Sequence, residues 1–518
     1  MNKATRSIII VGGGTAGWIT AGRIAAHHNA NSSDGIRVTL VESPNIPIIG
    51  VGEGTWPTMR NTLIKLGISE TDFMRECDAS FKQGAKFAKW VDGSRDDFYY
   101  HPLMLPQGFG TTNLVPYWQA YRTEKLQNKS FSAAVCFQEA ICEQGLAPKT
   151  ITTPEFSSVA NYAYHLNAGK FATFLQKHCC EKLGVTHVLA DVVSVNSADG
   201  GDISSVNTTQ AGEIRGDLFI DCTGFSSLLL GQHLQVPFID CSDVLFIDTA
   251  IAVQIPYETA DAPIASHTIS TAQEAGWIWD IGLTHRRGVG HVYSSHHTSD
   301  AEALQRLEEY VGPAIKNASL RKIPIQSGHR QVFWKNNCVA VGLSAGFLEP
   351  LEASALVLVE LSATMIAEQL PACREVMDIA AKRFNETFSY RWARIIDFLK
   401  LHYILSKRND NQFWIDNRNP KTIPESLQEL ISLWRYQSPS DHDFTSNNEV
   451  FPAASYQYVL YGMGFETSHY FSKHLMTNEK LAAEQFIKNQ KHIEQALRTL
   501  PSNRELLNKI YEYGLQSV

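Results

Sequence analysis

The sequence has 518 residues, of which 44% are hydrophobic, and a formal net charge of -8 from 45 basic and 53 acidic residues. A chain of this size can bury a large core and exceeds the usual size of one simple domain. It contains no run of lysine and arginine long enough to neutralise a row of phosphates, which excludes nucleic acid as an expected partner. The nine cysteines include no CxxC pair, so we expect no metal site, no disulfide framework and a cytoplasmic location.

The first predicted elements form a nucleotide-binding unit. The β-branched run Ser7 to Val11 predicts a buried strand, a helix follows from Thr15 to about His28, and "RVTLVES" predicts a second strand that ends at Glu42. The glycines between strand and helix are spaced as GxGxxG, which suits a tight turn, the approach of a pyrophosphate and close packing of the helix. The predicted cofactor-binding residues of this unit are Gly12, Gly13, Gly14, Thr15, Ala16, Gly17 and Glu42.

Two later segments favour FAD over NAD as the cofactor. "RGDLFIDCTGF" predicts a buried strand that ends at Asp221, and residues 336–356 predict a strand followed by Gly342 and a helix start. Flavoproteins of the glutathione-reductase-like class close their FAD site with units of this kind. We therefore expect an α/β fold with a Rossmann-like FAD-binding body at 1–390, of the glutathione-reductase and flavin-monooxygenase type, which carries inserted substrate-side segments. A mainly helical C-terminal lobe is expected at 391–518.

No apolar run is a convincing membrane span, because the best candidate, residues 353–367, carries Glu360 in its middle. We expect no membrane association. The segment "GWIWDIG" places Trp277 and Trp279 two residues apart, so that on a strand both indoles face the same side and form a wide aromatic wall.

Several motifs occur together in one order along the chain: "GGGTAGW", "GVGEGTWP", "FKQGAKFAKW", "GWIWDIG", "FLEPLEASAL" and "DFLKLHYILSKRNDNQFWID". In this combination the chain resembles the flavin-dependent tryptophan halogenases over about residues 6 to 465. The family signature WxWxIP is present except that Gly282 stands where proline is expected. The resemblance implies that Trp277 and Trp279 wall off the route between flavin and substrate.

The resemblance also implies the reaction. Reduced FAD and dioxygen give a peroxyflavin, a chloride or bromide ion takes its terminal oxygen to form hypohalous acid, and the halogen passes to an electron-rich ring such as tryptophan, indole or an indole-bearing compound. Only one complete dinucleotide fingerprint is present, so a separate NADH-dependent flavin reductase is the expected source of FADH2. The resemblance leaves a homodimer open.

Site residues follow from family position. Lys82 is implied as the lysine that delivers the halogen. Lys86 is the alternative, because on one strand the two lysines would share a face. Glu352 is implied as the catalytic carboxylate, and Glu349 is the alternative, which would lie on a similar face if the turn is helical. The residues implied to bind halide are Ser354 and Ala355, and those implied to complete the FAD site are Gly52, Asp221, Gly342 and Leu343.

Substrate contacts are predicted at Tyr100 and His101, which follow the lysine segment closely. No arginine or acid can be assigned to an amino-acid backbone, and the polar loop at 436–449 offers no clear clamp for one. We therefore expect indoles to be accepted at least as well as free tryptophan. Two other functions stay open: a flavin monooxygenase of the same fold, favoured by Gly282, and a flavin-binding protein without catalysis.

Overall fold

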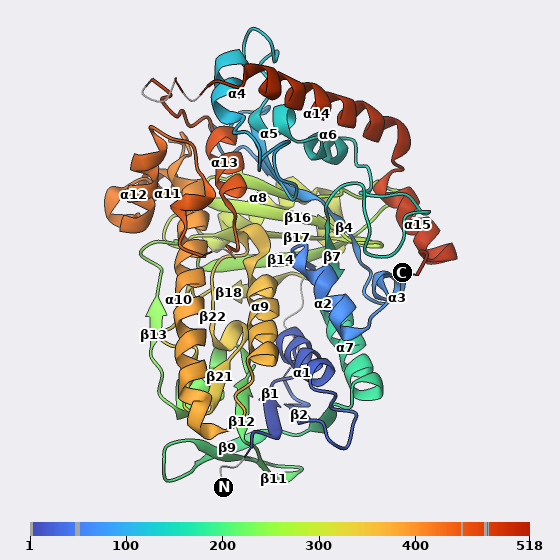
Figure 1. Cartoon of the computed structure of the whole chain (residues 1–518), viewed down its shortest axis with the longest axis vertical. Helices are drawn as coiled ribbons and strands as arrows, with labels where there is room; N and C mark the ends of the chain where they lie inside the picture. The colour runs from blue at the N-terminus through green and yellow to red at the C-terminus, as the bar shows by residue number, and fades with distance from the viewer. Residues whose placement is uncertain (1–3, 47–51, 447–448, 471–473, 475, 518) are drawn as a thin grey trace. The chain divides into compact units, whose positions relative to one another are not determined.

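The computed structural model of the chain describes residues 4–46, 52–446, 449–470, 474 and 476–517 (Figure 1). It divides into two compact units, each assembled from three segments of the chain. Unit 1 comprises the described residues of Met1–Ala79, Leu166–Cys241 and Gln326–Trp392. Unit 2 comprises those of Ser80–His165, Ser242–Ile325 and Ala393–Val518.

Unit 1 is built on a six-stranded sheet with the order β20-β21-β12-β1-β2-β8. All pairings are parallel except the one between β20 and β21. The strands are β1 (Ser7–Val11), β2 (Arg37–Glu42), β8 (Thr186–Leu189), β12 (Leu218–Asp221), β20 (Trp334–Lys335) and β21 (Cys338–Ala340). Ile8, Ile9 and Ile10 are at most 1% exposed, because a central strand of a parallel sheet is covered on both faces. The strands predicted at the N-terminus and at Asp221 are confirmed.

Helices of unit 1 cover this sheet. Helix α1 packs against α7 and α9. Figure 1 shows it next to β1 and β2. The helices are α1 (Thr15–His27), α2 (Thr58–Leu66), α3 (Glu70–Glu76), α7 (Ala168–Lys182), α9 (Ser354–Glu368) and the first part of α10 (Arg374–Ile404). Short helical turns of unit 1 are η1 (Gly224–Ser226), η2 (Leu228–His233), η4 (Gly342–Ser344) and η5 (Leu351–Ala353).

Two small antiparallel sheets complete unit 1. The first has the order β11-β10-β9 and the second β13-β19-β22. Their strands are β9 (Val192–Ser197), β10 (Ile203–Thr208), β11 (Gly212–Arg215), β13 (Phe238–Asp240), β19 (Gly328–Arg330) and β22 (Gly346–Phe347), and the short β3 (Gly52–Gly54) precedes α2.

Unit 2 contains a seven-stranded sheet with the order β18-β14-β17-β16-β15-β5-β6. It is antiparallel except between β15 and β5. The strands are β5 (Gly84–Ala88), β6 (Phe98–Pro102), β14 (Thr249–Pro256), β15 (Thr268–Gln273), β16 (Gly276–Gly282), β17 (Arg286–Tyr293) and β18 (Arg321–Pro324). The segment "GWIWDIG" is therefore a strand, as predicted, and it is central and buried along its whole length.

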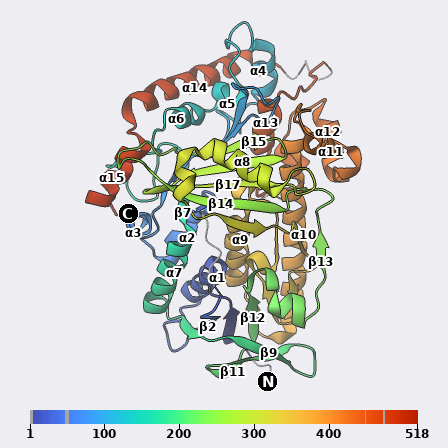
Figure 2. The ribbon, with the colours of Figure 1, turned by 180° about the vertical axis from the view of Figure 1, so that it is seen from behind.

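One face of this sheet is covered by α8 (Asp300–Val311), which Figure 2 shows lying across the strands. A reciprocal capping box between Ser299 and Glu302 begins this helix. Ala303 and Leu307 then pack into an apolar cluster with Ile278 and Val289 of the sheet. This core fixes the strand that carries the two tryptophans.

The rest of unit 2 is mainly helical. Its helices are α4 (Val115–Tyr121), α5 (Phe131–Val135), α6 (Gln138–Glu143), the last part of α10, α11 (Gln412–Asn417), α12 (Glu425–Trp434), α13 (Ala453–Gly462), α14 (Glu479–Thr499) and α15 (Asn503–Tyr513). Short turns are η3 (Pro313–Asn317), η6 (Pro420–Thr422) and η7 (Asp441–Asp443). Strand β4 (Ser80–Lys82) pairs with the first residues of β7 (Ala163–Asn167). None of the helices in the described part of the chain is both long and apolar enough to span a bilayer.

The predicted α/β fold with a Rossmann-like unit and a helical C-terminal part is confirmed. The compact units do not follow the two consecutive stretches 1–390 and 391–518, because residues 80–165 and 242–325 group with the C-terminal segment. The predicted division by function stays a prediction.

Candidate functional site

The turn between β1 and α1 is shaped by its glycines. Gly12 has φ 114°, and a Cβ there would lie 2.1 Å from the carbonyl oxygen of Cys222, while a Cβ at Gly17 would lie 1.9 Å from the oxygen of Gly12. Only glycine allows these approaches. A Cβ at Gly14 would meet no atom within 4 Å, so the space in front of the helix start is open.

Helix α1 begins as an anion site requires. No side chain caps it at Gly14, and its first turn, which includes Thr15 and Ala16, has no acidic residue. The first N–H groups of a helix lack partners inside it and carry partial positive charge. The turn therefore fits the pyrophosphate of a dinucleotide.

Glu42 ends β2 beside this turn. Its side chain lies where a Cβ of Gly13 would be, 2.1 Å from the Glu42 carboxyl carbon, and its Oε2 is 2.9 Å from Nε2 of His187. The carboxylate is thus held next to the glycine turn, where a ribose hydroxyl of a dinucleotide can donate to it.

In the structure, the carboxylate of Asp221 accepts hydrogen bonds from the protein's own backbone. Its buried Oδ2 accepts hydrogen bonds from the N–H groups of Leu229 and Leu230, both at 2.8 Å, and its Oδ1 accepts one from the N–H of Thr223 at 3.0 Å. The carboxylate therefore holds the turn after β12 in place. Its predicted part in FAD binding stays a prediction.

The strand–glycine unit around Gly342 lies directly beside α1. Gly342 has φ 73°, and a Cβ there would lie 2.8 Å from the Cβ of Ala16. Leu343 follows in η4 and is half-buried. Gly52 begins β3, and the residues just before it, 47–51, lie outside the described residues.

The turn before α9 is strained. Glu352 (φ 65°, ψ 5°) and Ala353 (φ 53°, ψ 41°) both adopt left-handed backbone conformations, which are unfavourable for residues with a Cβ. Helix α9 then begins at Ser354 without a side-chain cap. Ser354 is buried and Ala355 is exposed. The strain falls at 352 and 353, while Ala355 has ordinary helical geometry.

Glu349 and Glu352 are both buried, at 1% and 8% exposure. We expected that they would share a helical face if the turn were helical. Glu352 breaks the helical path, so their spacing of three residues does not place them on one face. Their separate roles stay predictions.

Lys82 and Lys86 do not share a strand face, contrary to our expectation. Lys82 ends β4, is 3% exposed and pairs with Ala163 of β7. Gln83 separates the two strands and donates its N–H to the oxygen of Ser266. Lys86 lies in β5, in the seven-stranded sheet, and its Nζ is 2.6 Å from Oε1 of Glu143. The positive charge of Lys86 is therefore balanced by the carboxylate of Glu143 in a partly exposed ion pair.

Two buried histidines that the sequence analysis did not predict interact with the two lysines, His165 with Lys82 and His267 with Lys86. Burial, and then the positive charges of Lys82 and His267, hold the pKa of His165 well below its usual value. Burial, and then Lys86, lowers the pKa of His267 to about 4. Both rings are therefore neutral at pH 7. Because histidine is more often a packed core residue than a functional one, no sequence pattern marked them.

The structure places Tyr100 and His101 on opposite faces of β6, since successive residues of a strand alternate. His101 is buried, with Nε2 2.9 Å from Oγ of Ser455. The Tyr100 hydroxyl donates to Glu143, the partner of Lys86. The two predicted substrate residues are therefore not brought together, and their shared role stays a prediction.

Trp277 and Trp279 share one face of β16, as predicted. The ring of Trp277 lies 6.3 Å from that of Trp90, and the ring of Trp279 fills the space over Gly290, where a Cβ would be 2.1 Å away. A Cβ at Gly282 would lie 2.8 Å from Cγ2 of Ile264 and 2.9 Å from the hydroxyl of Tyr257. A side chain at this position, where the family signature has proline, would require the side chains of Ile264 and Tyr257 to shift.

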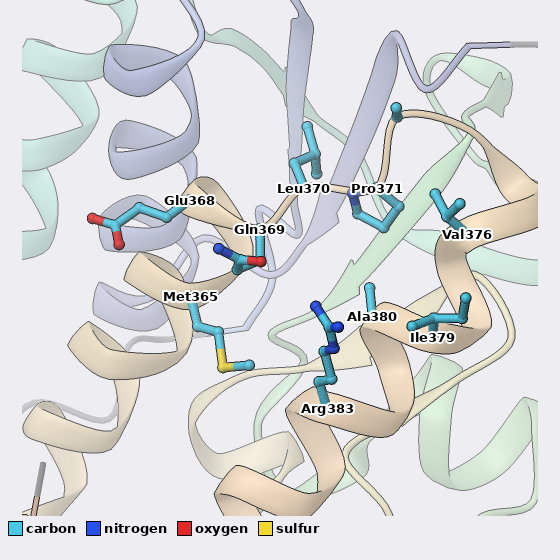
Figure 3. Close-up of a pocket in the computed structure, with 10 residues that line it drawn as sticks. Met365, Glu368, Gln369, Leu370, Pro371, Val376, Ile379, Ala380 and Arg383 are labelled. Carbon is cyan, nitrogen blue, oxygen red and sulfur yellow. The ribbon is translucent and has the colours of Figure 1, made fainter. Parts of the chain in front are cut away.

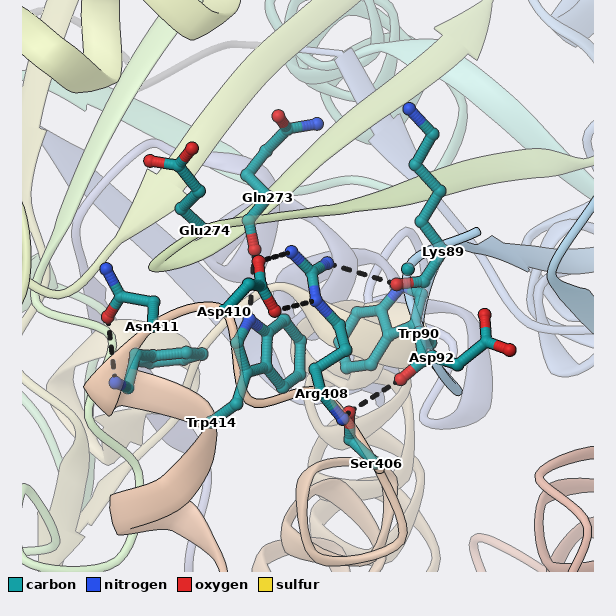
Figure 4. Close-up of polar contacts among 12 residues, drawn as sticks. Lys89, Trp90, Asp92, Gln273, Glu274, Ser406, Arg408, Asp410, Asn411 and Trp414 are labelled. Atoms are coloured by element: carbon teal, nitrogen blue, oxygen red, sulfur yellow. Dashed lines mark hydrogen bonds and ion pairs between the residues drawn. The ribbon is translucent and has the colours of Figure 1, made fainter. Parts of the chain in front are cut away.

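A polar network surrounds Trp90 and Trp414, whose ring centroids lie 5.6 Å apart (Figure 4). Arg408 donates to the carbonyl oxygen of Lys89 at 3.0 Å and lies 4.7 Å above the ring of Trp414. Ser406 donates to the carbonyl oxygen of Trp90 at 2.7 Å, and Trp414 Nε1 donates to the oxygen of Gln273 at 3.1 Å. Lys89 and Trp90 belong to the motif "FKQGAKFAKW", and Ser406, Arg408 and Trp414 belong to "DFLKLHYILSKRNDNQFWID". Their pairing follows only from the fold.

A cavity of about 390 Å³ opens where α9 ends and α10 begins (Figure 3). Met365, Gln369 and Arg383 are among its lining residues. None of the predicted site residues lines it.

Comparison with known proteins gives consistent matches along the whole chain. A family model for tryptophan halogenase matches residues 7–478. The 7-chloro-L-tryptophan 6-halogenase KtzR of Kutzneria sp. (strain 744) is 33% identical over 97% of this chain and 99% of its own length. A tryptophan halogenase crystal structure from Shewanella frigidimarina NCIMB 400 is 50% identical, with a TM-score of 0.96 over 100% of this chain and 99% of that one. BrvH, a flavin-dependent halogenase from Brevundimonas sp. BAL3, is 32% identical, with a TM-score of 0.86 over 98% and 99% of the two chains.

Proposed function

Because the chain belongs to the tryptophan halogenase family, we propose that this flavin-dependent halogenase transfers a halogen to an electron-rich aromatic ring by means of the residues described above. The observation that carries the assignment of the site is the left-handed pair Glu352 and Ala353, which starts α9 abruptly beside a buried carboxylate. An uncapped helix start and a carboxylate are the two groups that halide binding and ring deprotonation require.

The glycine turn and Glu42 fit FAD. The N–H groups at the start of α1 would hold the pyrophosphate, and Glu42 would accept a hydrogen bond from a ribose hydroxyl. When bound, the reduced flavin would supply the two electrons that activate dioxygen, and the activated oxygen would supply the two oxidising equivalents that convert a halide ion into an electrophile. The single fingerprint supports delivery of FADH2 by a separate NADH-dependent reductase. The proposed location of the reaction is the cytoplasm.

The halide would bind at the N–H groups of Ser354 and Ala355. A monatomic anion suits a helix start because backbone amides offer directed partial positive charge without a side chain that hypohalous acid would oxidise. Both chloride and bromide fit this chemistry.

Lys82 would deliver the halogen. Its ammonium donates a hydrogen bond to the oxygen of hypohalous acid, and as the ring carbon bonds to the halogen the oxygen–halogen bond breaks and the oxygen leaves as water with the proton of Lys82. Glu352 accepts the ring proton, so the ring regains its aromaticity. The neutral state of His165 supports this role, because a protonated neighbour would disfavour the ammonium. A haloamine on a deprotonated Lys82 is the alternative route for the same delivery.

The substrate would be tryptophan, indole or an indole-bearing compound. The test is to incubate purified protein with a flavin reductase, NADH, FAD, dioxygen and bromide or chloride, over a panel of indoles and free tryptophan, and to analyse products by mass spectrometry. We expect the mass and isotope pattern of one added halogen, with indoles converted at least as fast as tryptophan. Hydroxylated products alone would contradict the proposal and support a monooxygenase.

A further inference from the structure

The reaction as proposed leaves two residues without a role: Trp56, in the motif "GVGEGTWP", and Glu360, the acid in the middle of the apolar helix α9. Both take part in contacts within unit 1 between segment 56–62 and the region of α9. The indole Nε1 of Trp56, which is 9% exposed, donates a hydrogen bond of 2.8 Å to the backbone oxygen of Glu352. The acceptor of this hydrogen bond is therefore the backbone of Glu352, one of the two strained residues.

A second contact ties the same segment to α9. Thr58 Oγ1 donates to Oε1 of Glu360 at 3.1 Å, and Thr62 Oγ1 donates to the other carboxyl oxygen. Glu360 is 2% exposed and lies about two helical turns beyond Glu352. Segment 56–62 and α9 are therefore joined at two points, one at the turn and one within the helix.

The turn needs such support because its sequence favours a different path. Neither Glu352 nor Ala353 is glycine, and the left-handed conformation costs roughly 1–2 kcal/mol for each such residue. If these two residues relaxed to helical geometry, α9 would extend backwards. The amides of Ser354 and Ala355 would then donate to the carbonyls of Pro350 and Leu351, following the regular helical pattern.

We propose that Trp56 is a positioning residue for the halide site: its indole N–H holds the Glu352 carbonyl and so keeps the amides of Ser354 and Ala355 available to the anion. The inference rests on the proposed halide role of these amides. It assigns to Trp56 an effect on halide affinity, which a tryptophan that only fills the core would not have.

The experiment measures chloride binding without turnover, by the line broadening of chloride NMR on the protein loaded with oxidised FAD. The test variants are Trp56→Phe and a protein with benzothienylalanine at position 56, whose ring keeps the shape of indole but lacks the N–H donor. Trp334→Phe is the matched control. Trp334 is buried in the same unit, and its Nε1 donates at 3.0 Å to the carbonyl of Asn336, another left-handed residue.

We expect both changes at position 56 to weaken chloride binding about tenfold, the loss of one hydrogen bond to a buried carbonyl, and to leave FAD affinity within about twofold. Trp334→Phe should leave chloride affinity unchanged. Native chloride affinity in the benzothienylalanine protein would overturn the inference while the proposed function stands. Absence of chloride binding in the unaltered protein would overturn the halide site itself, and the inference with it.

Discussion

Helices α1 and α9 of unit 1 both begin without a side-chain cap, and their starts are built by different means. At α1 the backbone turns on glycines, which adopt the required conformations without strain. At α9 the turn uses Glu352 and Ala353 in conformations that glycine would adopt more easily, and a distant indole holds it. An anion site can therefore be encoded locally or imposed by a tertiary contact. The predictions below test that contrast, beginning with the change that should spare both turns.

Lys82→Ala should have the largest effect on activity. Formation of halogenated product should fall by about 10²- to 10⁴-fold, because a group that transfers a proton in the transition state is lost. Affinities for FAD and chloride should stay the same, since neither helix start is altered. Product analysis and binding titrations measure the two effects separately.

Lys86→Ala is the control for this change, because the two lysines lie in different strands and Lys86 is paired with Glu143. We expect it to keep most of the activity. If Lys86→Ala abolished product and Lys82→Ala did not, the assignment of the delivering lysine would be wrong.

Changes at Gly17 and Gly14 separate the stability of the first turn from its ability to bind. Gly17→Ala should lower the free energy of unfolding by about 3 kcal/mol, because its Cβ would meet the oxygen of Gly12 at 1.9 Å. Gly14→Ala should leave the Tm of the protein without FAD nearly unchanged, since its Cβ meets nothing, but weaken FAD binding about tenfold. Thermal unfolding with and without FAD measures both effects. An equal loss of Tm in the two variants would argue against open space at Gly14 in front of the start of α1.

Glu360 gives the helix that follows the second turn a pH-dependent stability. Burial raises its pKa from 4.5 to about 8, with Thr58, Thr62 and Arg23 opposing the shift. The folded protein therefore holds a proton that the unfolded chain releases. Stability should fall as pH rises from about 4.5 to about 8 and level off above, by on the order of 5 kcal/mol in all.

Glu360→Gln should remove this part of the pH dependence, because the amide does not titrate. Denaturant unfolding at pH 6 and pH 9 compares the two proteins. If the difference in stability between these pH values were the same in both, the carboxyl would not be buried in its neutral form.

Ala353→Gly should give the smallest effect, and it makes the second turn more like the first. Removing the Cβ from a left-handed residue should stabilise the protein by about 0.5–1 kcal/mol, and in combination with Trp56→Phe it should restore part of the lost chloride affinity. Ala355→Gly, at an ordinary helical position, should instead destabilise by about 1 kcal/mol. A destabilising Ala353→Gly would show that the turn is not strained.

The same contrast explains what the sequence could predict. The first turn was predicted to the residue, because strand, glycines, helix and Glu42 are neighbours in sequence and each has a local reason. The strand with Trp277 and Trp279 on one face was predicted for the same reason. The links from Trp56 to Glu352 and from Thr58 to Glu360 join segments some 300 residues apart, and no local pattern reports them.

The errors in prediction have similar causes. Lys82 and Lys86 were expected on one strand, but the chain changes sheets between them at Gln83, and only tertiary pairing reveals that change. Tyr100 and His101 lie on opposite faces of β6, and their predicted contacts with substrate stay predictions. Gly282 departs from the family signature at the position of its proline. The structure shows that Ile264 and Tyr257 occupy the space that a side chain there would take.

The measurement that tests the central claim most directly is the anomalous diffraction of bromide in crystals of the FAD-loaded protein. The account predicts a bromide peak within hydrogen-bonding distance of the amide nitrogens of both Ser354 and Ala355, with the FAD pyrophosphate at the start of α1. Crystals that bind bromide elsewhere, with no peak at these amides, would contradict it.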